Sequence, residues 1–261
     1  IGANGWASAS GESEFSDIFD GTISDVMIVN GNYTPSEPME PDHNAPWSDE
    51  VFRVYQAALN RMPDAIGFEG WTEKLGDGLP LLNVVEVFVN SAEFQTKYGA
   101  TDTTEFVTLL YNNVLNRGTD PTGLVGWSDR LDSQGWTRAE VVLGIAQSGE
   151  FVIKSTQNLI DWMRGSGIDD ELVAGAGDNV LVGGMYSDRF VFEASSDGNN
   201  RVTDLEAWDE VAFNGFGYAN DTAARGFLSQ SGDDVVFADQ GVSVTFENAT
   251  LGMFTDDLVV L

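Results

Sequence analysis

Three nine-residue segments follow one another without a gap over residues 165–191, and each carries an oxygen-bearing side chain at its sixth position. They read GSGIDDELV, AGAGDNVLV and GGMYSDRFV, so the sixth positions are Asp170, Asn179 and Asp188. Glycines precede these positions, at Gly165, Gly167, Gly175, Gly177 and Gly183. Glycine lets backbone carbonyls converge with little steric cost, and carboxylate and carbonyl oxygens are the ligands that Ca²⁺ prefers. The spacing therefore predicts calcium-binding turns.

The nine-residue period also predicts which turns face each other. If each segment is half a coil of a parallel β-roll, turns eighteen residues apart stack on the same side. We therefore expect Asp170 to face Asp188, and Asn179 to face Asp197, where the glycines of the turn are missing. Two calcium sites follow from this arrangement, the second weaker than the first. The eighth positions should point inward on short strands: Leu172, Leu181 and Phe190.

An alternative interpretation needs no metal. Glycine, asparagine and aspartate are common in ordinary turns between antiparallel strands. Three consecutive units in one register favour the calcium interpretation over this one, because isolated turns need not share a period.

The segments resemble the repeats-in-toxin (RTX) family of calcium-binding exported proteins. GGMYSDRFVF is similar to the usual last repeat of that family, and RVTDLEAWDEVAF to the segment that follows it. The resemblance implies a chain that stays unfolded inside the cell and folds outside, where calcium is abundant. Ile168, Ala174 and Tyr186 stand where the family has glycine, which lowers the expected affinity.

The last residues, DDLVVL at 256–261, are acidic and then apolar. In the RTX family such an ending resembles the uncleaved signal that type I secretion machinery reads. A last β-strand would account for the same residues.

Composition agrees with an extracellular calcium binder. The 261 residues include 42 acidic and 12 basic side chains, for a formal charge of -30, and no cysteine. This charge opposes nucleic acid and anionic membranes as partners and favours divalent cations. The chain has no thiol chemistry. Apolar runs such as 141–146 are far shorter than the roughly 18 residues of a membrane span, so we expect none.

Residues 49–163 contain an internal repeat. YQAALNRMPDAIGFEGW at 55–71 aligns without gaps with YNNVLNRGTDPTGLVGW at 111–127. Apolar residues at helical spacing predict three helices in each half. Asp64 and Asp120 precede expected helices and should act as N-caps, while Trp71 and Trp127 should lie on the core side. We expect this repeat to respond little to calcium.

The repeat resembles the bacterial domain of unknown function 4214. Its pattern of Asn-Arg, Asp, Gly, Gly-Trp and a later Ser-x-Glu-Phe occurs twice, the last element as NSAEF and QSGEF. Such domains accompany secreted and cell-surface proteins, and a similar segment in surface-layer proteins is associated with attachment to the cell's own polysaccharide. The resemblance assigns no binding residue.

The first 31 residues alternate apolar and polar positions, as in FSDIFDGTISDVMIVNG. They resemble the closing strands of a concanavalin-like or laminin-G jelly roll. Residues 32–48 hold four prolines among acidic and small residues and predict an extended linker. The expected fold is therefore multidomain α and β: a sandwich remnant at 1–31, a linker at 32–48, an all-α repeat domain at 49–163, and a β-roll with a β-rich tail at 164–261.

Catalysis has little support in the sequence. The only histidine, His43, lies in the linker, which excludes Ser-His-Asp and Cys-His arrangements and a zinc site. We expect a non-catalytic region of an extracellular or bacterial cell-surface protein, such as an adhesin. It would fold with calcium after type I secretion and attach to polysaccharide or to other copies of itself. The alternative is the accessory tail of a secreted polysaccharide-degrading enzyme.

Overall fold

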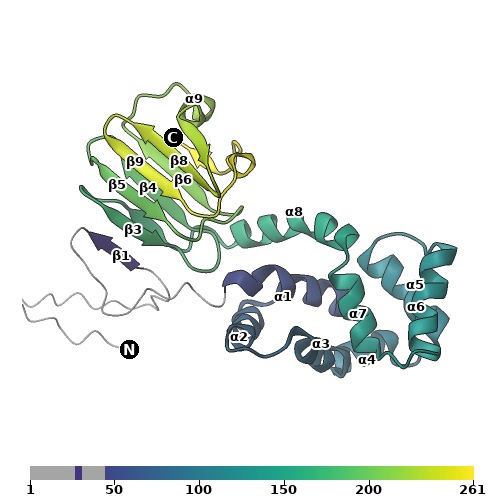
Figure 1. Cartoon of the computed structure of the whole chain (residues 1–261). Helices are drawn as coiled ribbons and strands as arrows, with labels where there is room; N and C mark the ends of the chain where they lie inside the picture. Colours follow the sequence, from purple (N-terminus) through teal and green to yellow (C-terminus); the bar gives the residue numbers. More distant parts are fainter. Residues whose placement is uncertain (1–26, 31–44) are drawn as a thin grey trace, which may run out of the picture.

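The computed structural model describes residues 27–30 and 45–261, in which a short strand at 27–30 is followed by the helices and then by the other strands (Figure 1). The expectations for 1–26 and 31–44, including most of the sandwich remnant, most of the linker and His43, lie outside the described residues. Residues 45–48 were expected to end an extended linker but are helical, so this part of the linker prediction is wrong. Strand β1 (Met27–Asn30) pairs antiparallel with β3 (Asn179–Val182), so part of the N-terminal segment joins the C-terminal sheet. The described part is mixed α and β.

The two halves of the internal repeat each form four helical segments, so the prediction of three per half is wrong. The first half follows the 3-10 turn η1 (Ala45–Trp47) and comprises α1 (Ser48–Val54) continuing as the π-helical turn η2 (Tyr55–Leu59), α2 (Ala65–Gly76), α3 (Leu81–Val89) and α4 (Ala92–Tyr98). The second comprises α5 (Thr103–Val114), α6 (Pro121–Asp132), α7 (Arg138–Ala146) and α8 (Gly149–Gly165).

The additional break in each half has a local cause. Ser91 and Ser148 take extended backbone angles, and their hydroxyls accept the backbone N–H of Phe94 and Phe151. A serine in this role ends the register of the preceding helix and starts a new one. The serine of the Ser-x-Glu-Phe element is therefore an N-cap.

The repeated motif builds the same polar network twice. The Asp64 carboxylate accepts the N–H of Gly67 at 3.0 Å, and the Asp120 carboxylate accepts that of Gly123 at 2.7 Å, which confirms both predicted N-caps. In the second half, Arg117 then joins Asp120 to Glu150, at 3.3 and 2.7 Å. Because Arg61 does the same for Asp64 and Glu93, the charged residues of the motif have a structural role.

The two repeated tryptophans pack against the helical core, as predicted, although both are only partly buried. The Trp71 ring lies 5.6 Å from that of Phe88. Trp127 covers Gly144, where a Cβ atom would come within 2.7 Å of the indole. Trp71 therefore joins α2 to α3, and Trp127 joins α6 to α7.

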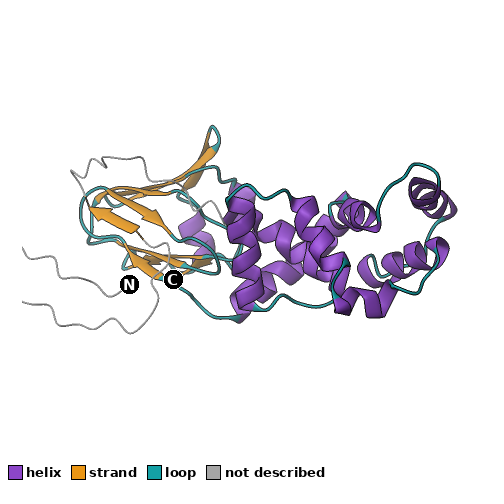
Figure 2. Cartoon of the chain, turned by 90° about the horizontal axis from the view of Figure 1, so that it is seen from below, coloured by secondary structure: helices purple, strands orange, loops and turns teal. Residues whose placement is uncertain are grey.

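The remaining chain forms two sheets that face each other across a common core (Figure 2). Their strands are β2 (Glu171–Val173), β3, β4 (Arg189–Glu193), β5 (Gly198–Val202), β6 (Glu210–Asn214), β7 (Leu228–Ser231), β8 (Asp234–Asp239), β9 (Val242–Phe246) and β10 (Val259–Val260), with α9 (Asp221–Arg225) and η3 (Leu251–Met253) between them. One sheet has the order β1-β3-β5-β9-β8-β7 and the other β10-β6-β4-β2.

Strands β2 to β6 alternate between the two sheets, and their pairings within each sheet are parallel. Glu171 pairs with Arg189, which is the predicted offset of eighteen residues, but Arg189 pairs with Glu210, twenty-one residues further on. The predicted inward positions are confirmed, since Leu172, Leu181 and Phe190 are fully buried in the core between the sheets.

The caps of the repeat predict equal costs for equivalent substitutions. Asp64→Ala and Asp120→Ala should each lower the free energy of unfolding by about 0.5–2 kcal/mol, because each leaves helix N–H groups without an acceptor. Glu73→Ala, on the exposed face of α2, should change it by less than about 0.5 kcal/mol. Urea unfolding followed by circular dichroism measures all three. A cap variant as stable as Glu73→Ala would contradict the capping role.

Candidate cation site

Aspartates of three turns that stack at one end of the sheet β10-β6-β4-β2 form a ladder. The backbone N–H of Asp170 donates to Asp188 Oδ1 at 3.0 Å. In the same way, the N–H of Asp188 donates to Asp209 Oδ1 at 3.0 Å. Each turn therefore places its carboxylate under the backbone of the preceding turn, and the expected pairing of Asp170 with Asp188 is observed.

The middle carboxylate of the ladder is buried and incompletely bonded. Asp188 and Asp209 are both 0% exposed. Asp188 Oδ2 is buried and accepts no hydrogen bond from the described residues. It faces Gly183, where a Cβ atom would lie 2.5 Å from this oxygen, so the glycine is required for the carboxylate to fit. A buried carboxylate oxygen without a donor is costly unless a proton or a cation compensates it.

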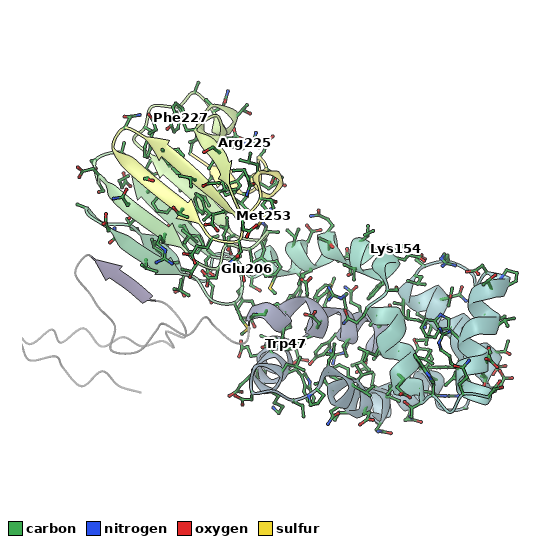
Figure 3. The ribbon with its side chains drawn as sticks, in the orientation of Figure 1. Trp47, Lys154, Glu206, Arg225, Phe227 and Met253 are labelled. Atoms are coloured by element: carbon green, nitrogen blue, oxygen red, sulfur yellow. The ribbon has the colours of Figure 1, made fainter. Side chains whose placement is uncertain are left out.

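The raised pKa values of the ladder also indicate that its carboxylates need a proton or a cation to neutralise them. Burial raises the pKa of Asp188 to about 8, and the negative charges of Asp209, Asp170 and Asp169 add to the effect. Burial also raises the pKa of Asp209, and that of Glu206, which lies beside it. Figure 3 labels Glu206 at the end of the strands nearest the helices. Proteins place several carboxylates together in this way at sites that hold a cation.

Three of these residues have the geometry of a shared cation site. The ligand oxygens of Asp169, Asp170 and Asp188 lie within 4.8 Å of one another. Oxygens bound to one Ca²⁺ at about 2.3–2.6 Å are at most about 5 Å apart, so one ion can contact all three. The remaining ligands would come from carbonyl groups of the glycine-containing turns. Hard oxygen donors without nitrogen or sulfur suit Ca²⁺ better than a transition metal.

The second predicted site has a different arrangement. Asn179 is buried and pairs with Asn200, whose Oδ1 accepts its amide at 2.7 Å, so the expected pairing with Asp197 is wrong. The coil there is three residues longer than eighteen, which places the Asp197 side chain in solvent while its carbonyl accepts the N–H of Gly177. The Asn179 amide also donates to the carbonyls of Gly175 and Gly177, at 2.8 and 3.1 Å. These hydrogen bonds satisfy the carbonyls that a cation would otherwise bind.

The other predicted glycines lie in or beside the first turn. Gly165 ends α8, and Gly167 follows it with φ +89°, a left-handed conformation that favours glycine. Both precede the Asp169–Asp170 pair, so the three-carboxylate group lies directly where the helical part passes into the strands. Whether these glycines contribute carbonyl ligands stays a prediction.

Sequence reasoning missed two members of the site. The repeat pattern does not predict Asp169, because it assigns the ligand to the sixth position, and it does not predict Asp209, because that turn contains no glycine. The signal for Asp209 is nevertheless present. It stands before an apolar strand, as WDEVAF, in the same position as Asp188 in SDRFVF twenty-one residues earlier.

The turn that carries Asp188 also packs against the helices. Tyr186 has φ +76°, a conformation that is unusual for a large side chain. Its ring lies 5.9 Å from that of Phe68 and 6.2 Å from that of Trp162, and its hydroxyl donates to Glu69 Oε1 at 2.9 Å. The charge of Glu69 in turn raises the pKa of Asp169, after the larger effect of burial. The candidate site therefore borders the helical part.

Comparisons with known proteins identify one domain. Residues 85–155 match a family described as a domain of unknown function, DUF4214; the match covers the end of the first half of the internal repeat and most of the second half. No curated protein matches the chain. Among the described residues, no helix is long and apolar enough to cross a membrane.

A solved structure with some similarity is that of the extracellular lipase LipA from Serratia marcescens. The two share 27% sequence identity over 35% of this chain, with a TM-score of 0.32. This chain covers 14% of the length of that lipase. Nothing about the activity of the lipase follows for this chain.

The raised carboxylate pKa values predict how stability depends on pH without calcium. The folded chain holds protons on Asp188 up to about pH 8, whereas the unfolded chain releases them near pH 4. This stabilising contribution is complete below pH 4 and is lost as the pH rises through 8. In chelator, the free energy of unfolding of the β part should therefore fall by at least about 1.4 kcal/mol, the equivalent of one pKa unit, between pH 5 and pH 8.

Asp188→Asn should reduce this dependence, because the amide does not titrate, while the raised pKa values of Asp209 and Glu206 keep part of it. Asp197→Asn, at an exposed position, should leave it intact. Thermal unfolding at several pH values measures both. Equal slopes in the two variants would show that Asp188 does not hold the proton.

Proposed function

We propose that this chain is a calcium-dependent region of an extracellular protein, in which the ion completes the fold after export. The single observation that supports this best is the buried Asp188 carboxylate, whose Oδ2 has no donor among the described residues and lies beside two further aspartates. Calcium would replace the proton there and satisfy the free oxygen. In the cytosol calcium is scarce, whereas extracellular modules bind it at about 0.1–1 mM.

The finer assignment is a β-roll of the RTX kind with a type I secretion signal at its end. Parallel strands that alternate between two sheets, with aspartates stacked at their turns, support the β-roll. The terminal residues form β10, which pairs with β6. The secretion signal would thus be part of the folded sheet after export, and it would be accessible only while the chain is unfolded.

We also propose a cell-surface or adhesive role, with attachment to glycans or to other copies of the chain. The match to DUF4214 supports a modular protein of this kind without naming a ligand. In this arrangement the β part provides the calcium-dependent fold and the helical repeat provides a rigid surface. We include in this proposal that residues 1–31 are the closing strands of a laminin-G-like domain.

The contact of Tyr186 with the helices changes the expected response of the helical repeat to calcium. The helical repeat was expected to respond little to calcium, but the turn that carries Asp188 packs against Phe68 and Trp162 of the helices. The same interface includes Arg164 of α8, which donates to the carbonyls of Ala207 and Trp208 beside Asp209. An ion that orders these turns would therefore also stabilise the helices that contact them.

The calcium site has a direct test. Asp188→Asn should raise the calcium concentration at half-saturation at least about tenfold, because it removes one of three charged ligands. At a hundredfold excess over Kd, calcium should stabilise the wild-type chain by about 2.7 kcal/mol. Calorimetric titration of the intact chain measures the affinity, with Asp197→Asn as the exposed control. No heat of calcium binding, or an equal affinity in both variants, would leave these segments as ordinary turns.

The coupling to the helices has a separate test. Tyr186→Gly relieves the left-handed strain at this position but removes the ring that contacts Phe68 and Trp162. Calcium should still bind, whereas its stabilisation of α2 and α8 should be lost. Hydrogen exchange of these helices, with and without calcium, measures the effect. Tyr186→Phe keeps the ring and should retain most of the coupling; wild-type helices that do not respond to calcium would refute it.

A further inference from the structure

A polar hollow of about 540 Å³ lies between the two halves of the helical repeat, away from the candidate cation site. Its size is in the range of small-ligand sites. Half of its lining consists of carboxamide side chains, contributed by η2, the loops after η2 and α5, the end of α5, and α8. These are Gln56, Asn60, Asn113, Asn116 and Asn158.

The internal duplication brings two equivalent residues into this one hollow. Asn60 follows η2 and Asn116 follows α5, and they occupy the same position in the two aligned copies of the motif. Both have left-handed backbone angles, with φ +50° and +48°. Glycine is the usual residue for this conformation at the end of a helix, and asparagine the less common one. Two asparagines at these positions satisfy the backbone and also place two amides at the hollow.

The charged residues at the hollow are already engaged. Arg61 pairs with Asp64 and Glu93, and Lys154, labelled on α8 in Figure 3, pairs with Glu150 and donates to the carbonyl of Leu115. Val114 and Phe151 contribute buried apolar surface. Among the lining amides, Asn113 donates to the Tyr98 hydroxyl at 2.9 Å and Gln56 to the sulfur of Met62 at 3.5 Å. The available groups are therefore the amides of Asn60, Asn116 and Asn158, each with a donor and an acceptor, over a partly apolar floor.

This combination matches a ligand with several adjacent hydroxyl groups. One amide donates to one hydroxyl and accepts from its neighbour, while the C–H face of a sugar ring contacts apolar side chains. A nucleotide or an anionic lipid would instead need unpaired cationic groups, which the pairing of Arg61 and Lys154 does not provide, and the charge of -30 would repel it.

We propose that this hollow binds a sugar unit of a glycan, with Asn60, Asn116 and Asn158 as the contacting amides. The proposal rests on the attachment role proposed above and names the site and the ligand chemistry for it. It does not depend on the cation site, because none of the three aspartates of that site lines the hollow.

The test separates the amides from the backbone conformation that they occupy. Glycine adopts the left-handed conformation freely, so a variant with Asn60→Gly and Asn116→Gly keeps the loops and loses both amides. Asn158→Ala removes the third amide from an exposed position of α8. A matched control is Asn248→Gly, where an asparagine with φ +53° lies in the β part.

The intact wild-type chain is first applied, with calcium, to an array of neutral and uronate-containing oligosaccharides. The strongest ligand is then titrated calorimetrically into each variant. We expect at least a tenfold loss of affinity for the double glycine variant and for Asn158→Ala, an unchanged affinity for Asn248→Gly, and unchanged thermal unfolding in all of them. A preference for neutral over uronate sugars would support the proposal, because Arg61 and Lys154 are already paired with carboxylates.

Two results would overturn the proposal. If a glycan binds the wild-type chain and the glycine and alanine variants equally, the site is wrong while the attachment role stands. If no oligosaccharide on the array binds, the site and the attachment to glycans both fail. Calcium-dependent folding is measured without any glycan, so its outcome is independent of either result.

Discussion

The burial of aspartates without a matching positive charge is the constraint on which the junction of this protein depends. Asp188 and Asp209 are fully buried, and each accepts the backbone N–H of the Asp one turn earlier. The turns can stack only if these carboxylates lie between them. Their charge must then be neutralised by protons or by a bound cation. Folding of the strands, pH and cation concentration are therefore linked through the same few oxygens.

The helices and the strands meet at this point. The turn before Asp188 carries Tyr186 into the aromatic cluster of Phe68 and Trp162, and Arg164 binds the carbonyls before Asp209. An aromatic residue in a left-handed conformation has a conformational cost, which contacts on the helical side can offset. The departure of Tyr186 from the glycine pattern thus has a physical explanation that lies outside the repeat itself.

Much of the local structure was predictable because its causes are local. The N-caps at Asp64 and Asp120, the inward positions of Leu172, Leu181 and Phe190, and the pairing of Asp170 with Asp188 follow from spacing and side-chain chemistry. The helix count failed at Ser91 and Ser148, where a capping serine interrupts an apolar run. The pairing of Asn179 failed because three additional residues change the coil length from eighteen to twenty-one.

The sequence by itself determined the duplicated helical motif, the period of the acidic turns and the excess of negative charge, because each depends on residues that are close in the chain or on composition alone. Only the tertiary structure decided that Asn179 pairs with Asn200, that Tyr186 docks on the helices, and that Asn60 and Asn116 share one hollow. These arrangements join residues far apart in sequence, and packing of whole elements sets their distances. A periodic pattern carries no information about that packing.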